Sequence, residues 1–194
     1  VSWYYNEPTK DSGTWSNGEL YWVVDVGGTQ IAQGTTFRDL IKTGDKTTES
    51  YLHDDSLVGI YKGTLPGGKS ISDYKDFNDF KINGGLKLIQ NQFTTQFNGT
   101  APNYNELLFK ANKDIKLENG EKVYMIIKSE PAELPTRTNN RDTKTYKNSI
   151  YIKVDDNYVS EQTAEKTLYT SPNILKELGQ VFKYDGTKVT NLKI

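Results

Sequence analysis

The sequence contains no cysteine among its 194 residues, which excludes disulfide bonds, thiolate zinc sites and cysteine nucleophiles. It contains one histidine, and it has no apolar run long enough to cross a lipid bilayer. No stretch has the pattern of a secretory leader. Because the chain begins at Val1 rather than at methionine, we expect it to be a fragment of a larger polypeptide whose targeting signals lie elsewhere.

An excess of charge of either sign is also missing. Lys and Arg number 24 and Asp and Glu number 25, which gives a net charge of −1, and the charges are well mixed along the chain. No basic surface for nucleic acid and no cationic face for a membrane is therefore predicted. The length suffices for a substantial core, either as one large domain or as one domain with the beginning of another.

Aromatic residues are abundant: there are 13 Tyr, 7 Phe and 3 Trp, although only 35% of the residues are hydrophobic. Together with many Thr, Val and Ile, they favour strands over helices and predict an all-β fold. The central stretch, residues 20–26, alternates with a period of two, which is typical of a half-buried strand. One face carries Leu20, Trp22, Val24 and Val26, and the other carries Tyr21, Val23 and Asp25.

Two further strands are predicted at 37–41 and 146–154, and each places a polar residue among apolar neighbours, Asp39 and Asn148 respectively. One interpretation is a buried pair whose members hydrogen-bond to each other or to nearby backbone. The other is the remnant of an intramolecular Lys–Asn isopeptide site, a site in which a neutral lysine attacks the carboxamide while a protonated acid carries the proton. Burial lowers the pKa of an amine and raises that of a carboxylic acid, as this chemistry requires.

The remaining segments vary in character. We expect helical turns at 70–80, a surface loop at 98–105, a long exposed loop at 130–145, a helix-compatible stretch at 160–167, a capped short helix at 171–179 and a hairpin at 181–194. The expected organisation is one domain over residues 1–158, followed by a C-terminal extension, residues 159–194, that completes this domain or begins the next.

Nothing in the sequence supports an enzyme. His53 lies beside Asp54, but no serine stands in a nucleophile motif. The paired glycines are not followed by the helix and the Lys-Thr pair of a phosphate-binding loop. The pair formed by Asp54 and Asp55 offers too few ligands for Ca²⁺. We therefore expect no catalytic residues, no cofactor and no metal.

The order of four motifs resembles a known family. Trp3-Tyr4-Tyr5, residues 21–26, residues 37–41 and residues 146–149 follow one another as in the collagen-binding domains of Gram-positive cell-wall-anchored adhesins, over about residues 1–158. The resemblance implies an immunoglobulin-like sandwich of the DE-variant type, in which extra strands or helical turns lie between strands D and E. The helical turns expected at 70–80 fall suitably for that position.

The resemblance also implies roles for the buried polar residues. Asp39 falls where the family has its isopeptide catalytic acid, and Asn148 where it has the amide acceptor. The family lysine follows an aromatic pair on the first strand, but here Asn6 stands at that position. Because Lys10 follows Pro8 in what reads as a polar turn, we expect the bond to be absent and Asn6 to hydrogen-bond to Asp39 or Asn148.

The family's ligand trench corresponds to Tyr5, Val23 and Asp25, with Tyr21 on the same face. The implied function is that of an extracellular domain on a bacterial surface, anchored to the cell wall through a region outside this chain. It would bind a host extracellular-matrix protein, with collagen as the first candidate, and contact adjacent domains of the same surface protein. Two alternatives stay open: a carbohydrate-binding module that uses exposed Tyr and Trp, and a stalk domain that binds nothing.

Overall fold

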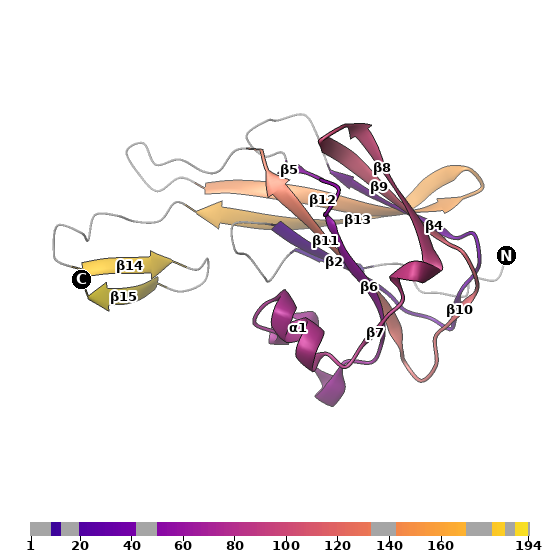
Figure 1. Ribbon diagram of the computed structural model, residues 1–194, viewed down its shortest axis with the longest axis horizontal. Coiled ribbons are helices and arrows are strands. Elements are labelled where there is room, and N and C mark those ends of the chain that lie inside the picture. The colour runs from indigo at the N-terminus through magenta and orange to yellow at the C-terminus, as the bar shows by residue number, and fades with distance from the viewer. Residues whose placement is uncertain are drawn as a thin grey trace.

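The computed structural model describes residues 9–12, 20–41, 50–132, 143–169, 180–184 and 189–193. Tyr5, Asn6 and the helix expected at 171–179 lie outside the described residues. Most of the described secondary structure is β-strand, and its sheets are antiparallel, which confirms the predicted all-β class (Figure 1).

Two sheets form the body of the protein. The first has the order β1-β2-β11-β6-β7, and a further short strand, β5, pairs with β11. Its strands are β1 (Thr9–Ser12), β2 (Leu20–Val26), β5 (Ser50–Tyr51), β6 (Leu57–Gly63), β7 (Lys87–Leu88) and β11 (Lys122–Pro131). The second sheet has the order β13-β12-β4-β9-β8. Its strands are β4 (Thr36–Ile41), β8 (Phe93–Thr100), β9 (Asn103–Ala111), β12 (Thr143–Val154) and β13 (Asn157–Tyr169).

The strand order is that of an immunoglobulin-like sandwich, in which one sheet carries strands A, B, E and D and the other carries G, F and C. Strands β1, β2, β11 and β6 match the first set in order, and β13, β12 and β4 match the second. The chain between β6 and β11, the D and E positions, contains the helices and the hairpin β8–β9, which extends the second sheet beside β4. The predicted DE-variant sandwich is therefore confirmed.

Short helices follow β6 within this insertion. They are η1 (Pro66–Gly68), η2 (Ile71–Asp73), α1 (Phe77–Asn83) and η3 (Gln90–Gln92). The helix α1 begins after Asp76, whose side chain accepts a hydrogen bond from the Asp79 N–H at 2.8 Å, as a good N-cap does. The helical turns expected at 70–80 are thus present, and they extend by three residues to Asn83. Figure 1 shows α1 against the outer side of the first sheet.

The main core lies between the sheets and contains the apolar faces expected from the period-two pattern. Trp22, Phe37 and Tyr146 are among its largest fully buried side chains. The indole Nε1 of Trp22 donates a hydrogen bond of 2.8 Å to Ser129 Oγ, so its one polar atom is satisfied inside the core.

One loop is shorter than expected. The segment 98–105 is a tight hairpin, because β8 continues to Thr100 and β9 begins at Asn103. Gly99 has φ = 123°, and a Cβ atom there would stand 2.8 Å from Asn105 Oδ1, so this corner requires glycine.

The expectation of helix at 160–167 is wrong, because these residues belong to β13, which pairs with β12 along most of its length. Pairing with a neighbouring strand overrides the weak helical preference of this polar segment. β13 also crosses the expected boundary at residue 158. After it, β14 (Gln180–Tyr184) and β15 (Val189–Lys193) pair as the hairpin predicted at 181–194. A further short pair joins β3 (Gln30–Ile31) to β10 (Ile115–Lys116).

Candidate functional site

The structure brings Asp39 and Asn148 together inside the core. Asp39 lies on β4 and Asn148 on β12, and both side chains are completely buried. In the register of these strands, Asn148 is opposite Ile41 and Asp39 is opposite Ile150. The two polar residues are therefore diagonal neighbours on the same inner face, a position from which long side chains can interact.

The amide of Asn148 is unusual for a buried group. Among the residues that the structure describes, neither its oxygen nor its nitrogen has a hydrogen-bond partner. Leaving a buried polar group unpaired costs about 1–3 kcal/mol. The interpretation in which Asp39 satisfies this amide is thus not what the described residues show, and the amide needs another explanation.

The placement of Lys10 differs from the expected polar turn. Residues 9–12 form strand β1, in which Lys10 is the register partner of Val24. Val24 itself belongs to the main core. β1 also lies beside β13, whose other neighbour is β12, the strand that carries Asn148. Lys10 therefore stands in a strand paired with β2 and not in a polar turn, so the reason for excluding it does not hold.

The predicted ligand face is partly covered. Val23 is only 2% exposed, so it does not line an open trench as the sequence analysis expected. Side chains of the insertion and of the neighbouring strands bury it in a second apolar cluster on the outer side of the first sheet. We call this the outer cluster, and its members are Val23, Tyr61, Leu65, Ile71, Tyr74, Phe80, Tyr124 and Ile126.

Aromatic rings hold the outer cluster together. The ring of Phe80 makes edge contacts with those of Tyr74, Tyr61 and Tyr124, at centroid distances of 5.3, 6.1 and 6.1 Å. Gly59 makes room for this arrangement, because a Cβ atom there would lie 2.5 Å from the Tyr61 ring. Such edge-to-face pairs contribute stability beyond the area that they bury.

Tyrosine ionisation should make the outer cluster sensitive to alkali. Burial, aided by the nearby charge of Asp25, raises the pKa of Tyr124 to about 12. In the unfolded chain, tyrosine ionises near pH 10, so folding favours the protonated phenol. Stability is fully present below about pH 10 and should fall as the pH rises from about 10 to 12. Urea unfolding across this range should show a smaller fall for Tyr124→Phe, and an equal fall would contradict this assignment.

Tyr21 and Asp25 remain half-buried beside the outer cluster. Asp25 Oδ2 lies 3.4 Å from Lys122 Nζ, and Lys128, the register partner of Tyr21, lies 3.1 Å from Asp55 through its own Nζ. Tyr21, Asp25, Lys122 and Lys128 form what we call the β2–β11 strip. It offers one aromatic ring and charges of both signs.

The outer face of the second sheet carries a polar–aromatic cluster that sequence reasoning missed. The Arg38 guanidinium lies over the rings of Tyr158 and Tyr151, at 5.0 and 5.7 Å from their centroids, and its Nε is paired with Glu106. Asn98 donates a 2.7 Å hydrogen bond to the same carboxylate. The alternating sequence pattern could place Arg38 and Tyr151 on the outer face, because their neighbours Asp39 and Ile150 face the core. The cluster was missed because the strand that carries Tyr158 was not predicted.

Other kinds of site have no support within the described ranges. No group of three or more His, Asp or Glu side chains there could hold a metal ion. Across those same residues, no helix is long and apolar enough to cross a membrane. That the chain is not an enzyme stays a prediction.

No protein-family model matches the chain, and no curated protein does either. Similar solved structures include the collagen-binding subdomain ACE19 of an Enterococcus faecalis surface protein, with 13% identity, a TM-score of 0.41, and coverage of 82% of this chain and 95% of that one. The major pilin SpaD of Corynebacterium diphtheriae has 10% identity, a TM-score of 0.41, and coverage of 84% of this chain and 34% of that one.

The collagen-binding domain of the Erysipelothrix rhusiopathiae surface protein RspB has 13% identity and a TM-score of 0.40, and the match covers 88% of this chain and 50% of that one. This chain thus spans half or less of the matched RspB and SpaD chains. The strand order, and not these similarities, defines the fold.

Proposed function

We propose that this chain is a non-enzymatic domain of a Gram-positive surface adhesin, anchored to the cell wall through a region outside the chain. Its ligand is a host extracellular-matrix protein, with collagen as the first candidate. The observation that supports this most is the β2–β11 strip, where an aromatic ring and ionic groups lie together on the outer face of the first sheet.

The chemistry of the strip suits a collagen triple helix. That ligand is a proline-rich rod whose chains are extended and whose backbone is well solvated. Tyr21 can pack against its pyrrolidine rings, while Lys122 and Lys128 can donate hydrogen bonds to its carbonyl groups. Because Val23 is covered, the contact surface lies to the side of the insertion and not beneath it.

Binding of the chain to an immobilised panel tests this function. The panel holds triple-helical collagen, denatured collagen, fibrinogen, fibronectin and host glycans. We expect saturable binding to native collagen, and a loss of about 30-fold in affinity for a chain carrying Tyr21→Ala and Asp25→Ala, since a binding hot spot contributes about 2 kcal/mol. The control carries Tyr151→Ala on the opposite outer face and should bind normally. Failure to bind any matrix protein would refute the proposed ligand.

Two outcomes of the same experiment point elsewhere. Binding only to glycans, lost in the Tyr151→Ala control, would favour a carbohydrate-binding module that uses the half-buried Tyr151 and Tyr158. No binding across the panel would favour a stalk domain that only spaces its neighbours in the same surface protein.

We also propose that the core holds an intramolecular cross-link between Lys10 and Asn148. The neutral Lys10 amine attacks the Asn148 carbonyl carbon, a new C–N bond forms, and the carboxamide nitrogen leaves as ammonia. Asp39 takes up the proton that the attacking amine gives up and passes it to the leaving nitrogen. The pairing of Lys10 with Val24 in strand β1 and the unpartnered Asn148 amide support this proposal.

A further inference from the structure

The strand β8 forms one edge of the second sheet, and among the described residues no strand pairs with its outer side. Exposed edges attract other strands, and proteins normally protect them with lysine, proline or a very short strand. β8 has eight residues, Phe-Thr-Thr-Gln-Phe-Asn-Gly-Thr, and none of them is charged or is proline. By contrast, β7, the edge of the first sheet on this side, has two residues and carries Lys87.

The register of the hairpin shows which backbone groups face outward. Asn112 N–H donates to the Gln92 carbonyl at 2.9 Å, and the pairs continue from Phe93 with Ala111. Hydrogen-bonded pairs alternate along an antiparallel ladder. The N–H and C=O groups of Thr95 and Phe97 and the C=O of Phe93 therefore point away from β9, toward the free edge, while the Phe93 N–H donates to the Gln90 carbonyl.

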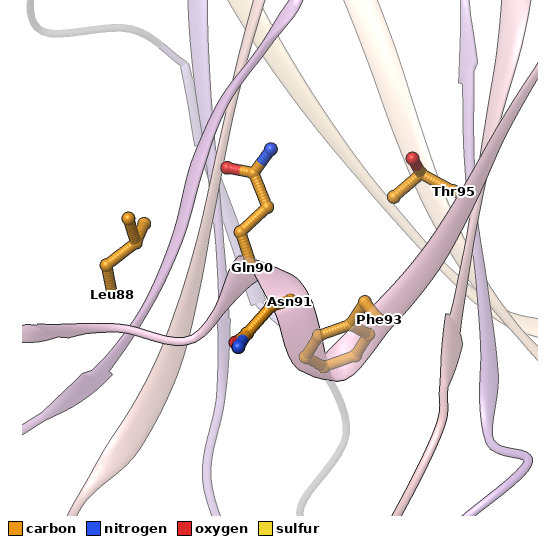
Figure 2. A pocket seen from close by; sticks show the side chains of 5 residues that line it. All are labelled: Leu88, Gln90, Asn91, Phe93 and Thr95. Carbon is orange, nitrogen blue, oxygen red and sulfur yellow. The ribbon is translucent and has the colours of Figure 1, made fainter.

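The free edge borders an open cavity. Its volume is about 610 Å³, and Leu88, Gln90, Asn91, Phe93 and Thr95 line it. Figure 2 shows these side chains, which come from one continuous segment, β7, η3 and the start of β8, that crosses from the first sheet to the second. Leu88 is 57% exposed here, and none of the lining residues is charged. An approaching strand would thus meet apolar and amide groups and no charge that it must desolvate.

We propose that the free edge of β8 is a self-association surface, at which β8 pairs antiparallel with β8 of a second copy of this chain. The strand is complementary to itself when the two-fold axis passes through Thr95. Thr95 then faces its own copy, and Phe93 faces Phe97 of the second copy. All three residues are matched, and because the Phe93 N–H of each copy is already bonded to Gln90, this register allows about four new backbone hydrogen bonds.

The side chains of this register agree with the backbone. Phe93 opposite Phe97 and Thr95 opposite Thr95 are aromatic and threonine pairs, which are favourable across antiparallel strands. The absence of charge on β8 means that two copies do not repel each other at the contact. Because a single strand pair buries little area, the dimer should be weak and dependent on concentration.

Single cysteines test the register directly, since the chain has none of its own. In the proposed dimer the two Thr95 Cα atoms lie about 5.5 Å apart, within disulfide range, whereas Thr94 faces Gln96 and the two Thr94 residues are too far apart. Thr95→Cys should therefore form a disulfide dimer in mild oxidant at least about tenfold faster than Thr94→Cys. Equal rates would overturn the proposal, provided that circular dichroism shows both variants folded.

Sedimentation of the chain over a concentration series gives a second, independent readout. Thr95→Lys places two like charges directly opposite each other and should abolish the dimer, because such pairs destabilise antiparallel strands. Thr94→Lys is the matched control, since its lysine faces Gln96 and leaves the dimer in place. Both threonines are exposed in the single chain, so neither change disturbs the core. A chain that stays monomeric at every concentration would refute the proposal.

Discussion

The intact mass of the purified chain is expected to fall short of the mass of its sequence by one ammonia molecule. This deficit is the direct product of the cross-link proposed between Lys10 and Asn148. Lys10→Ala and Asp39→Ala should each restore the full mass, the first by removing the amine and the second by removing the acid. Lys147→Ala is the matched control, because this neighbour of Asn148 is exposed and pairs with Glu165, so the deficit should persist.

Loss of the cross-link should also be visible in stability. By the chain-entropy treatment, closing a loop of about 140 residues, the length between Lys10 and Asn148, stabilises a fold by about 5 kcal/mol. For a domain of this size, that corresponds to a fall in melting temperature of about 10–20 °C in Lys10→Ala. If the unaltered chain has the full mass of its sequence, the cross-link proposal is wrong. The bond would then be absent, as the presence of Asn6 at the family's lysine position predicts.

Phe80→Ala should release the insertion from the first sheet. This side chain is 1% exposed and contacts three tyrosine rings, and truncating a buried phenylalanine to alanine costs about 3–5 kcal/mol. We expect a lower urea midpoint and faster hydrogen exchange in α1, with the β12–β13 ladder much less affected, since it lies in the other sheet.

Ile82→Ala is the control for this experiment. Ile82 lies in the same helix but is 68% exposed, so its loss should change stability by no more than about 0.5 kcal/mol. Similar effects of the two substitutions would show that the Phe80 ring does not anchor the insertion.

Strands with one core face could be predicted from sequence. Residues 20–26, 37–41 and 146–152 alternate between apolar and other residues, and all three are strands with the expected faces. They alternate because one face of each strand is buried. The same pattern located Asp39 and Asn148 inside the core, because each interrupts an apolar series.

Strands without such a face could not be predicted. β1 has the sequence Thr-Lys-Asp-Ser, which reads as a turn, and its pairing with β2 becomes evident only in three dimensions. The segment 160–167 likewise tolerates a helix, and β12 alone makes it a strand. These two errors had different consequences. The first excluded Lys10 from the candidate isopeptide site, and the second hid the strand β13, on which Tyr158 lies beside Arg38.

The covering of Val23 was also beyond sequence reasoning. Alternation fixes the face of a strand on which a side chain lies, but it does not reveal what packs against that face. The side chains that bury Val23 include Phe80 and Tyr74, which are remote from it in sequence. The sequence of that region predicted helical turns, but it did not show which surface they pack against.

The order of strands in the sheets also governs when the chain can fold. β2 ends at Val26 but its inner neighbour β11 begins only at Lys122, and β4 ends at Ile41 while its neighbour β12 begins at Thr143. Such distant pairings make folding slow, because the intervening chain must be ordered first.

During synthesis, β2 and β4 therefore cannot pair with their inner neighbours, β11 and β12, until more than half of the chain has left the ribosome. Meanwhile only local structure such as α1 and the β8–β9 hairpin can form. The nascent domain consequently emerges with its future core exposed, and its completion depends on β12 and β13, which are the last strands of the two main sheets to be made.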